Sequence, residues 1–360
     1  MSNKGKLKYI FTSSHTKNGF HSFIPDLIAD LSQVFILKGP AGSGKSTFIR
    51  LLGETMSEQG YEIEFWISAI EPLNPDGVYI PQLDVAVVNG SLPIPIDPEY
   101  PASMAEIINL GELLDKEASN NNRQFVRKLV NEIASENKKA YALLKQASIV
   151  KQEIKKITSK HLDLEKIQSL IDNLAQDILS DQPREKHYFA SALTAEGMIK
   201  YTDEISSTCN KRYILKGPSG SAKSTVINEL AYIFREKGFI LEYYHSGLDA
   251  DSIDMVIIRN LQVALIDGGN TEIIIKPWDT VIDMTKYLEK YDTDNAEMLK
   301  SESYRNYESL VLEAQSELAN MQGSLKDLKK IYAAITNFAE LNERRETLRM
   351  QIMDLQDKLM

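Results

Sequence analysis

Two stretches of this sequence place glycine, lysine and hydroxyl side chains at a spacing that can hold a phosphate group. The first, called the first loop below, reads Gly39-Pro40-Ala41-Gly42-Ser43-Gly44-Lys45-Ser46-Thr47 and meets the full GxxxxGK[ST] pattern. Its glycines let successive backbone N–H groups turn toward an anion, and the following helix adds its positive end. We expect Lys45 to reach the β- and γ-phosphates of a nucleotide and the Ser46 hydroxyl to ligate Mg²⁺. The nucleotide-binding candidates here are Gly39, Gly42, Ser43, Gly44, Lys45, Ser46 and Thr47.

The second stretch, called the second loop, reads Gly217-Pro218-Ser219-Gly220-Ser221-Ala222-Lys223-Ser224-Thr225. Ala222 stands where the pattern has its last glycine. Because alanine tolerates helical dihedral angles and this position opens the predicted helix, we expect the loop to keep its shape. Nucleotide binding is the favoured interpretation, and a relic that keeps the shape without the ligand is the alternative. The candidates here are Gly217, Gly220, Ser221, Ala222, Lys223, Ser224 and Thr225, with Ser224 as the metal ligand.

An acidic residue at the end of a nearby apolar strand commonly holds the Mg²⁺ of such a site. Residues 263–266 followed by Asp267 fit this description, whereas the matching position after residues 85–88 is Asn89. An amide carries no negative charge, so Asp84 or Asp97 is the nearest substitute. The first loop matches the phosphate-binding pattern more closely, and the second is the one followed by an acidic residue after its third strand. This difference is compatible with different roles for the two sites or with slow turnover at both. The catalytic candidates are Lys45, Lys223 and Asp267.

Weaker candidates accompany these loops. Asp249, Asp251 and Asp254 cluster after a predicted strand, and Asp76 is the counterpart of Asp254. A hydrogen-bonded turn with a helix N-cap is the favoured interpretation of this cluster, ahead of a group that orients water. Arginines could also stabilise developing charge, and the sequence does not choose among Arg50, Arg212, Arg235 and Arg259.

The segments that must position these residues occur twice in the sequence. Residues 11–90 align with residues 189–268 at a constant offset of 178, and 27 of the 80 positions are identical. Unrelated sequences of this composition agree at roughly one position in fifteen. Duplication is the economical explanation.

Each copy reads as strand, loop, helix, strand, loop, strand. Short apolar runs, a helical segment closed by glycine and a second and third apolar run follow one another. This alternation predicts an α/β fold of two tandem modules with parallel β-sheets. The predicted strands are 34–37, 62–68 and 85–88 with 213–215, 240–246 and 263–266, and the predicted helices are 45–59 and 223–237.

A helical arm is expected after each module. Residues 112–182 contain no glycine or proline, and beyond Pro277 the only such residue is Gly323. A single helix over the first of these segments would be about 107 Å long, so we prefer a hairpin that bends near residues 158–161. The expected domains are residues 1–110, 111–184, 185–290 and 291–360.

Apolar side chains repeat along both arms at steps of three and four, which is typical of a helix packed on another helix. Packing within each hairpin is favoured over a coiled coil that binds a partner protein. The repeating residues are Leu164, Ile167, Ile171, Leu174 and Ile178 with Leu348, Ile352, Leu355 and Leu359.

Composition narrows the class of protein. Hydrophobic residues make up 43% and charged residues 26% of the 360 residues, as in ordinary folded domains. A net charge of −10 argues against nucleic acid as a partner. One cysteine, Cys209, and no apolar run of about 18 residues or signal-like N-terminus lead us to expect a cytoplasmic protein without a membrane span.

The chain resembles a bacterial family of tandemly duplicated phosphate-loop proteins known as predicted ATPases or nucleotide kinases. The likeness rests on the two loops, on residues 249–254, on Asp267-Gly268 and on residues 97–101 leading into residues 107–111. Family members carry Asp-Gly-Thr-Ala-Pro-His after the third strand, and residues 89–94 and 267–272 both lack the Pro-His pair. The resemblance implies a fold and a nucleotide ligand, and it supplies no substrate.

Three functions remain open on this sequence. The first and favoured one is an ATPase that uses ATP, or another nucleoside triphosphate, with Mg²⁺ and changes the arrangement of its modules and arms. The second is a nucleotide or small-molecule kinase with Asp267 or Asp254 near the acceptor hydroxyl. The third is a scaffold in which the loops only stabilise the fold.

Overall fold

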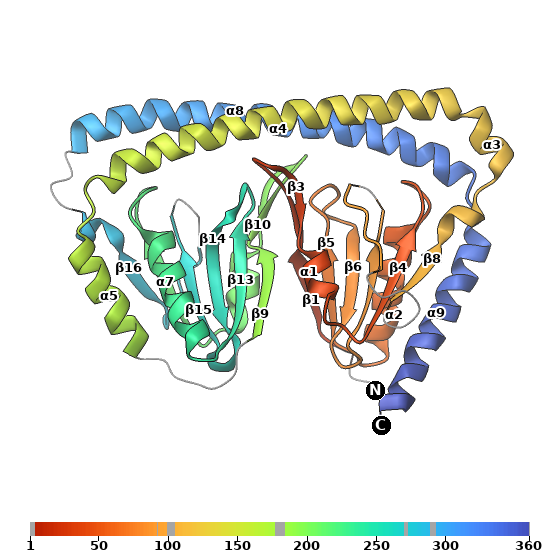
Figure 1. The fold of residues 1–360 in the computed structure, drawn as a ribbon, viewed down its shortest axis with the longest axis horizontal. Helices are drawn as coiled ribbons and strands as arrows, with labels where there is room; N and C mark the ends of the chain where they lie inside the picture. Colours follow the sequence, from red (N-terminus) through yellow and green to blue (C-terminus); the bar gives the residue numbers. More distant parts are fainter. Residues whose placement is uncertain are drawn as a thin grey trace.

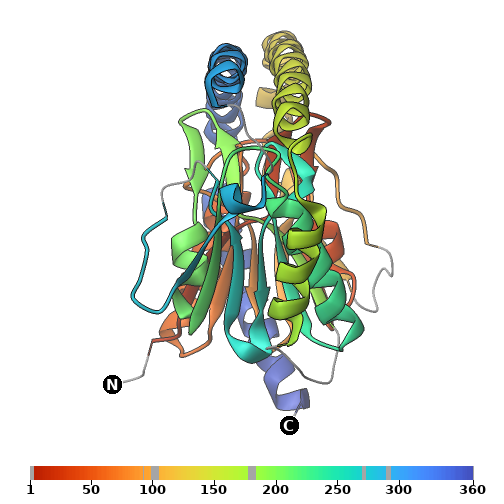
Figure 2. The same cartoon turned by 90° about the vertical axis from the view of Figure 1, so that its left-hand side faces the viewer.

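The computed structural model describes residues 4–91, 93–98, 105–176, 184–269, 273–288 and 293–359. Within these ranges, twelve strands form one mixed sheet with the order β16-β12-β15-β14-β13-β9-β1-β5-β6-β7-β4-β8. Two long helices, α4 (Arg123–Ser159) and α8 (Thr293–Ala334), run side by side above both halves of this sheet (Figures 1 and 2). None of the described helices is both long and apolar enough to cross a membrane.

The two halves of the sheet have the same order of elements. The first half contains β1 (Leu7–Phe11), β4 (Gln33–Lys38), β5 (Ile63–Ile67), β6 (Pro75–Ile80), β7 (Val85–Asn89) and β8 (Ala105–Asn109). The second half contains β9 (Arg184–Phe189), β12 (Lys211–Lys216), β13 (Ile240–Ser246), β14 (Asp249–Ile258), β15 (Val263–Asp267) and β16 (Thr280–Asp283). The halves meet where β1 pairs antiparallel with β9 at Phe11 and Phe189, residues that the 178-residue offset also relates.

Smaller elements complete each half. Two-stranded hairpins stand apart from the large sheet: β2 (Ser13–Thr16) with β3 (Gly19–Ser22), and β10 (Ser191–Thr194) with β11 (Gly197–Lys200). The helices are α1 (Ile24–Ile28) and α2 (Lys45–Glu58) in the first half and α6 (Thr202–Ile205) and α7 (Lys223–Glu236) in the second. The predicted strands and helices are confirmed to within about two residues at each end.

The predicted α/β fold is confirmed, and the sheet is mostly but not entirely parallel. In each half one strand, β6 or β14, runs antiparallel between two others. The sequence hid β6 because it opens with Pro75, Asp76 and Gly77, residues that are typical of turns. Val78 and Ile80 of the same strand are fully buried, so packing outweighs local preference. A hydrogen-bonded turn with a helix N-cap was expected for Asp249, Asp251 and Asp254, and all three lie in strand β14, where no helix follows the turn.

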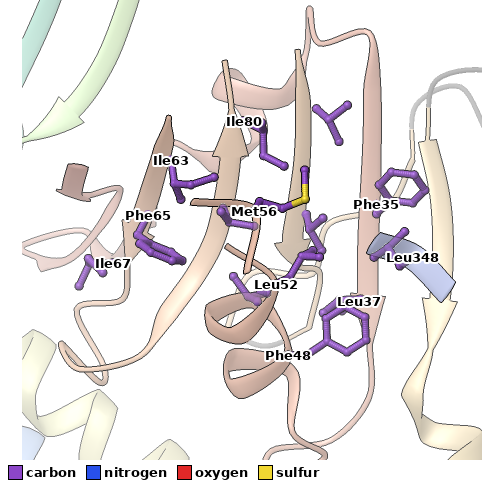
Figure 3. Close-up of a cluster of buried hydrophobic side chains, with 14 of the residues drawn as sticks. Phe35, Leu37, Phe48, Leu52, Met56, Ile63, Phe65, Ile67, Ile80 and Leu348 are labelled. Carbon is purple, nitrogen blue, oxygen red and sulfur yellow. The ribbon is translucent and has the colours of Figure 1, made fainter. Parts of the chain in front are cut away.

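The core of the first half lies between its strands and α2. Phe48, Leu52 and Met56 of α2 pack into one cluster with Phe65 and other strand residues (Figure 3). Each such side chain is almost completely buried, which contributes about 1.5–3 kcal/mol. This packing fixes α2, and therefore the first loop that precedes it, relative to the strand ends.

The long helices pack differently from the expected hairpins. The bend near residues 158–161 is confirmed, because α4 ends at Ser159 and α5 (Leu164–Gln176) follows. However, α4 lies along α8, where Ala140 and Leu144 meet Ala314 and Leu318 in a shared buried cluster. The prediction that each arm packs on itself as a hairpin is therefore wrong. Small alanine side chains allow the two long helices to approach each other closely.

The apolar stripes of the shorter helices cover the two halves of the sheet. Ile167 and Ile171 of α5 are buried against α7, and Leu348 and Ile352 of α9 (Phe338–Leu359) are buried with α2. Helix α5 thus belongs to the second core although it follows the first half in sequence (Figure 1). Ile178 lies outside the described residues, as do residues 99–101 and 270–272 of the family motifs.

A buried ion pair holds the outer part of the second half together. Arg212 in β12 donates to Asp279 over 2.6 Å and to Asp203 over 2.9 Å, and the side chains of Arg212 and Asp279 are 0% exposed. The guanidinium holds the pKa of Asp279 below its ordinary value of 3.8. This contribution to stability is therefore present at neutral pH and lost only as the pH falls through that lowered pKa.

Replacing Arg212 by Met should lower the free energy of unfolding by about 3–5 kcal/mol, because Asp279 then remains buried and unpaired. Urea denaturation at pH 7 measures this change. The control is Arg235→Met, since the Arg235 side chain is 46% exposed and its ion pairs lie at the surface. Equal midpoints for the two variants would contradict the structural role given to Arg212.

Candidate functional site

The first loop joins the end of β4 to the start of α2 and holds a buried lysine. Lys45 is 7% exposed, and its Nζ donates to the carbonyl oxygens of Gly39 and Pro40 over 2.8 Å each. Burial, and then the positive charge of Lys329, lower the pKa of Lys45 to about 8, while Asp76 opposes this shift. An ammonium group with so little water around it is poised to bind an anion.

The loop is tied to the end of β7. The Ser91 hydroxyl donates to the Gly39 carbonyl over 2.9 Å and accepts from the Gly39 N–H over 3.1 Å. The Ser91 N–H in turn donates to Asn89 Oδ1 over 3.2 Å. Asn89 therefore helps to shape the loop, a role that the sequence did not suggest. Ser46 and Thr47 follow in the first turn of α2.

The second loop repeats this arrangement with an acid beside the lysine. Lys223 is 5% exposed and donates to the carbonyl oxygens of Gly217 and Pro218 over 3.0 and 2.8 Å. Its Nζ lies 3.7 Å from Asp267 Oδ1. Burial lowers the pKa of Lys223, and Asp267 opposes the shift. Ser224 and Thr225 occupy the first turn of α7.

Ala222 does not have the helical backbone that we expected. Its φ is +64°, in the left-handed region, and the matching Gly44 has a φ of +87°. A left-handed conformation costs an alanine about 1–2 kcal/mol, whereas glycine adopts it freely. The loop keeps its shape against this strain, so the surrounding packing determines the conformation.

The antiparallel strands bring further acids to the loops. Because β6 and β14 run opposite to their neighbours, Asp76 near the start of β6 and Asp254 in the middle of β14 lie at the edge where β7 and β15 end. Asp76 accepts from Asn89 Nδ2 over 3.0 Å and from Ser68, so a carboxylate stands beside the amide of the first half. Asp254 accepts from the Ser246 hydroxyl and lies near Asp267.

These two carboxyl groups are partly buried, and both have raised pKa values. Burial, and then the charge of Asp267, raise the pKa of Asp254 to about 6. Burial raises the pKa of Asp76 as well, against hydrogen bonds from Asn89 and Ser68. Asp76 therefore fits the missing acid of the first half better than the substitutes suggested by the sequence.

The substitutes suggested by the sequence, Asp84 and Asp97, make other contacts. Asp84 is at the opposite end of β7, where it accepts from Ser32 and Tyr79. Asp97 forms an exposed ion pair of 2.6 Å with Lys38, the last residue of β4. The contacts of Asp84 lie far from the first loop, and Asp97 is bound to the residue that precedes Gly39.

Two lysines that the sequence analysis missed reach the loops from the crossing helices. Lys329 of α8 packs on Gly42: a methyl group built on this glycine would lie 2.4 Å from the Lys329 carbonyl oxygen. Lys155 of α4 packs on Gly220 with the same separation of 2.4 Å. The sequence does contain a pattern that could have pointed to these two lysines, because Lys-Lys-Ile occurs at residues 155–157 and again at residues 329–331.

The arginines considered from the sequence are engaged away from the loops. Arg212 belongs to the buried pair with Asp279, and Arg259 donates to Glu242 over 2.5 Å. Arg235 pairs with acids at the surface, and Arg50 is exposed on α2. Lysines, rather than these arginines, supply the positive charge above the loops.

The carboxylate cluster after β13 forms contacts between the two halves. Lys17, in the turn between β2 and β3, pairs with Asp249 over 2.8 Å and with Asp251 over 3.3 Å. Asp249 Oδ1 also accepts from the Asp251 N–H over 3.2 Å, so the turn that we favoured is present while the helix is not. Asp254 alone of this cluster lies beside Asp267.

Asp254→Asn should raise the free energy of unfolding at pH 7 by about 1–3 kcal/mol when no nucleotide is added. The folded chain binds the Asp254 proton more tightly than the unfolded chain does. Wild type therefore loses stability relative to the variant as the pH rises from about 4 to about 6, and the difference stays constant above that.

Urea denaturation over this pH range measures the effect, and Asp251→Asn is the control because the Asp251 side chain is 76% exposed. A variant that is less stable than wild type at pH 7, or a difference that does not change with pH, would rule out a strained carboxylate at residue 254.

Comparison with known proteins agrees with this site. A family model described as the KAP family P-loop domain matches residues 22–335, which include both loops, the adjoining acids and the two crossing helices. Searches of curated proteins and of solved structures gave no match. The expectation of a P-loop NTPase family is confirmed at that level, and nucleotide binding follows from it. The chain belongs to the KAP family of P-loop domains.

Proposed function

We propose that this protein binds ATP, or another nucleoside triphosphate, with Mg²⁺ at both loops and hydrolyses it. The observation that carries the proposal is the pair of buried lysines, Lys45 and Lys223, each bonded to two carbonyl oxygens of its own loop. A lysine in this place can exchange those neutral acceptors for phosphate oxygens, which form stronger charge-assisted hydrogen bonds.

The oxygen donors around each loop fit Mg²⁺, which prefers hydroxyl and carboxylate ligands. Ser224 and Asp267 would hold it in the second half, and Ser46 with Asp76 or Asn89 in the first. The Ser221 hydroxyl supports a polar ligand here, since it is buried in the second loop and has no hydrogen-bond partner in the described part of the chain. Bound Mg²⁺ would neutralise part of the charge on the phosphates.

The remaining residues suit hydrolysis. The attacking water forms a bond to the γ-phosphorus, the bond to the bridging oxygen breaks, and the water proton passes to a carboxylate. Asp254, which lies beside Asp267, would take this role in the second half, and Asp76 would take it in the first. With a pKa of about 6, Asp254 is mostly ionised at neutral pH and can accept the proton.

We further propose that the chain is two modules derived from one ancestral unit, with domains at residues 1–110, 111–184, 185–290 and 291–360. The 178-residue offset and the matching strand order support this. Nucleotide-dependent rearrangement would act through α4 and α8, since each packs on a loop. A kinase is the second candidate, and a scaffold that does not turn over nucleotide is the third.

Lys45→Ala and Lys223→Ala should each weaken nucleotide binding at the altered loop by about 10- to 100-fold, because a charged hydrogen bond to phosphate is lost. Phosphate release from Mg-ATP and Mg-GTP, measured with and without nucleosides and sugars, gives the activity. Lys128→Ala is the control, since this lysine is 67% exposed on α4.

Release without an acceptor that depends on Lys45 or Lys223 supports hydrolysis. Turnover only with an acceptor would instead identify a kinase, and tight binding without turnover would identify the scaffold. Binding that is unchanged in a variant carrying both substitutions would contradict the nucleotide site itself.

A further inference from the structure

We propose that each phosphate site is completed by a lysine from the other half of the chain: Lys329 of α8 at the first loop and Lys155 of α4 at the second. Each would contact the terminal phosphate of a bound nucleoside triphosphate. This inference rests on the proposed nucleotide site and assigns two ligand residues to it that lie outside the loops.

The first support is the close approach of the helix backbones to the loops. A methyl group built on Gly42 would lie 2.9 Å from the Lys329 Cα, and one built on Gly220 would lie 3.0 Å from the Lys155 Cα. Real Cβ atoms do not come as close to another atom as the 2.4 Å that separates each methyl group from the lysine carbonyl oxygen, so only glycine fits under each helix. The side chains of Lys329 and Lys155 therefore start within a few ångströms of the loop that binds phosphate.

The second support is the charge around each pair of lysines. Lys329 lowers the pKa of Lys45, and Lys155 contributes to lowering that of Lys223. Two ammonium groups held close together repel each other, and the acids offset this only in part. A triphosphate between them supplies the missing negative charge.

The acids that face these lysines occupy matching positions. Lys329 forms an ion pair with Glu71, and Asp76 lies in the same cluster. Lys155 is half-buried and senses the charges of Asp249, the counterpart of Glu71, and of Asp254 and Asp267, as well as the nearby Lys151. The ion pair with Glu71 and the carboxylates around Lys155 attract the two ammonium groups toward these acids.

The ends of both helices are fixed to the half that they serve. At the first loop, Asp115 N–H donates to the Ile335 carbonyl and Asn337 N–H to the Leu113 carbonyl, each over 2.9 Å. At the second, Asp163 N–H donates to the Tyr287 carbonyl over 2.7 Å. These backbone bonds anchor the chain just after α8 to the first half and the chain just after α4 to the second.

The second loop offers one more group from α4. Thr158 lies one turn beyond Lys155, and its Cβ would be 3.0 Å from a methyl group on Gly220. Its hydroxyl is buried and has no hydrogen-bond partner among the described residues. A phosphate oxygen at this place would accept from it, which supports a ligand between α4 and the loop.

The test compares triphosphate with diphosphate binding at one loop at a time. Lys329→Ala is made in the Lys223→Ala background, so that only the first loop reports, and Lys155→Ala is made in the Lys45→Ala background. The matched controls are the exposed neighbours, Lys330→Ala and Lys156→Ala. Fluorescent ATP and ADP analogues with Mg²⁺ give both affinities, and thermal unfolding checks that each variant is folded.

Lys329→Ala should weaken ATP binding at the first loop by about 10- to 100-fold and ADP binding by less than about 3-fold, since only the triphosphate reaches the helix. Lys155→Ala should act in the same way at the second loop. Lys329→Arg should restore most of the affinity because it restores the charge. The two controls should bind like their backgrounds.

Equal losses for ATP and ADP, or affinities no different from those of Lys330→Ala and Lys156→Ala, would overturn the proposal. An Arg variant as weak as the Ala variant would also overturn it. Two results together would rule out the helix lysines alone and leave the proposed nucleotide site standing. Replacing the remaining loop lysine in each background abolishes binding, and the helix variants bind like their backgrounds. If wild type binds neither analogue, the proposed function fails with it.

Discussion

The two buried ammonium groups of Lys45 and Lys223 are the constraint around which the structure is arranged. Each charge is almost completely removed from water and is held by two carbonyl oxygens of its own loop. Burying a charge is costly unless it is well solvated by other groups. Strand ends, acids and a crossing helix converge on each loop, and the proposed anion site is built from them.

The halves share this arrangement and differ in its details. The first half has glycine at residue 44 and an amide, Asn89, at the end of β7, with Asp76 supplying the carboxylate. The second has the strained Ala222 together with the two carboxylates Asp254 and Asp267. The helix α4 packs on the second loop and α8 on the first, so each loop contacts a helix that follows the other half in sequence.

The sequence predicted the features that depend on interactions between residues close together in the chain. The loops, their flanking strands and helices and the bend after α4 follow from sequence periodicity and glycine positions. Strand β6 was missed because Pro75, Asp76 and Gly77 are typical of a turn. The residues that follow them form a strand because the sheet buries their side chains. The packing partners of α4 and α5 were missed because an apolar stripe shows that one face of a helix is buried. It does not show which element buries that face. Lys155 and Lys329 required a contact between distant segments that only the fold reveals.

The stoichiometry of nucleotide binding tests the central claim most directly. Isothermal titration calorimetry of the full chain with Mg-ATP should give two sites per chain, one site in each of the single variants Lys45→Ala and Lys223→Ala, and none when both are replaced. Binding of unchanged stoichiometry in the double variant, or no binding to the wild-type chain, would contradict the account.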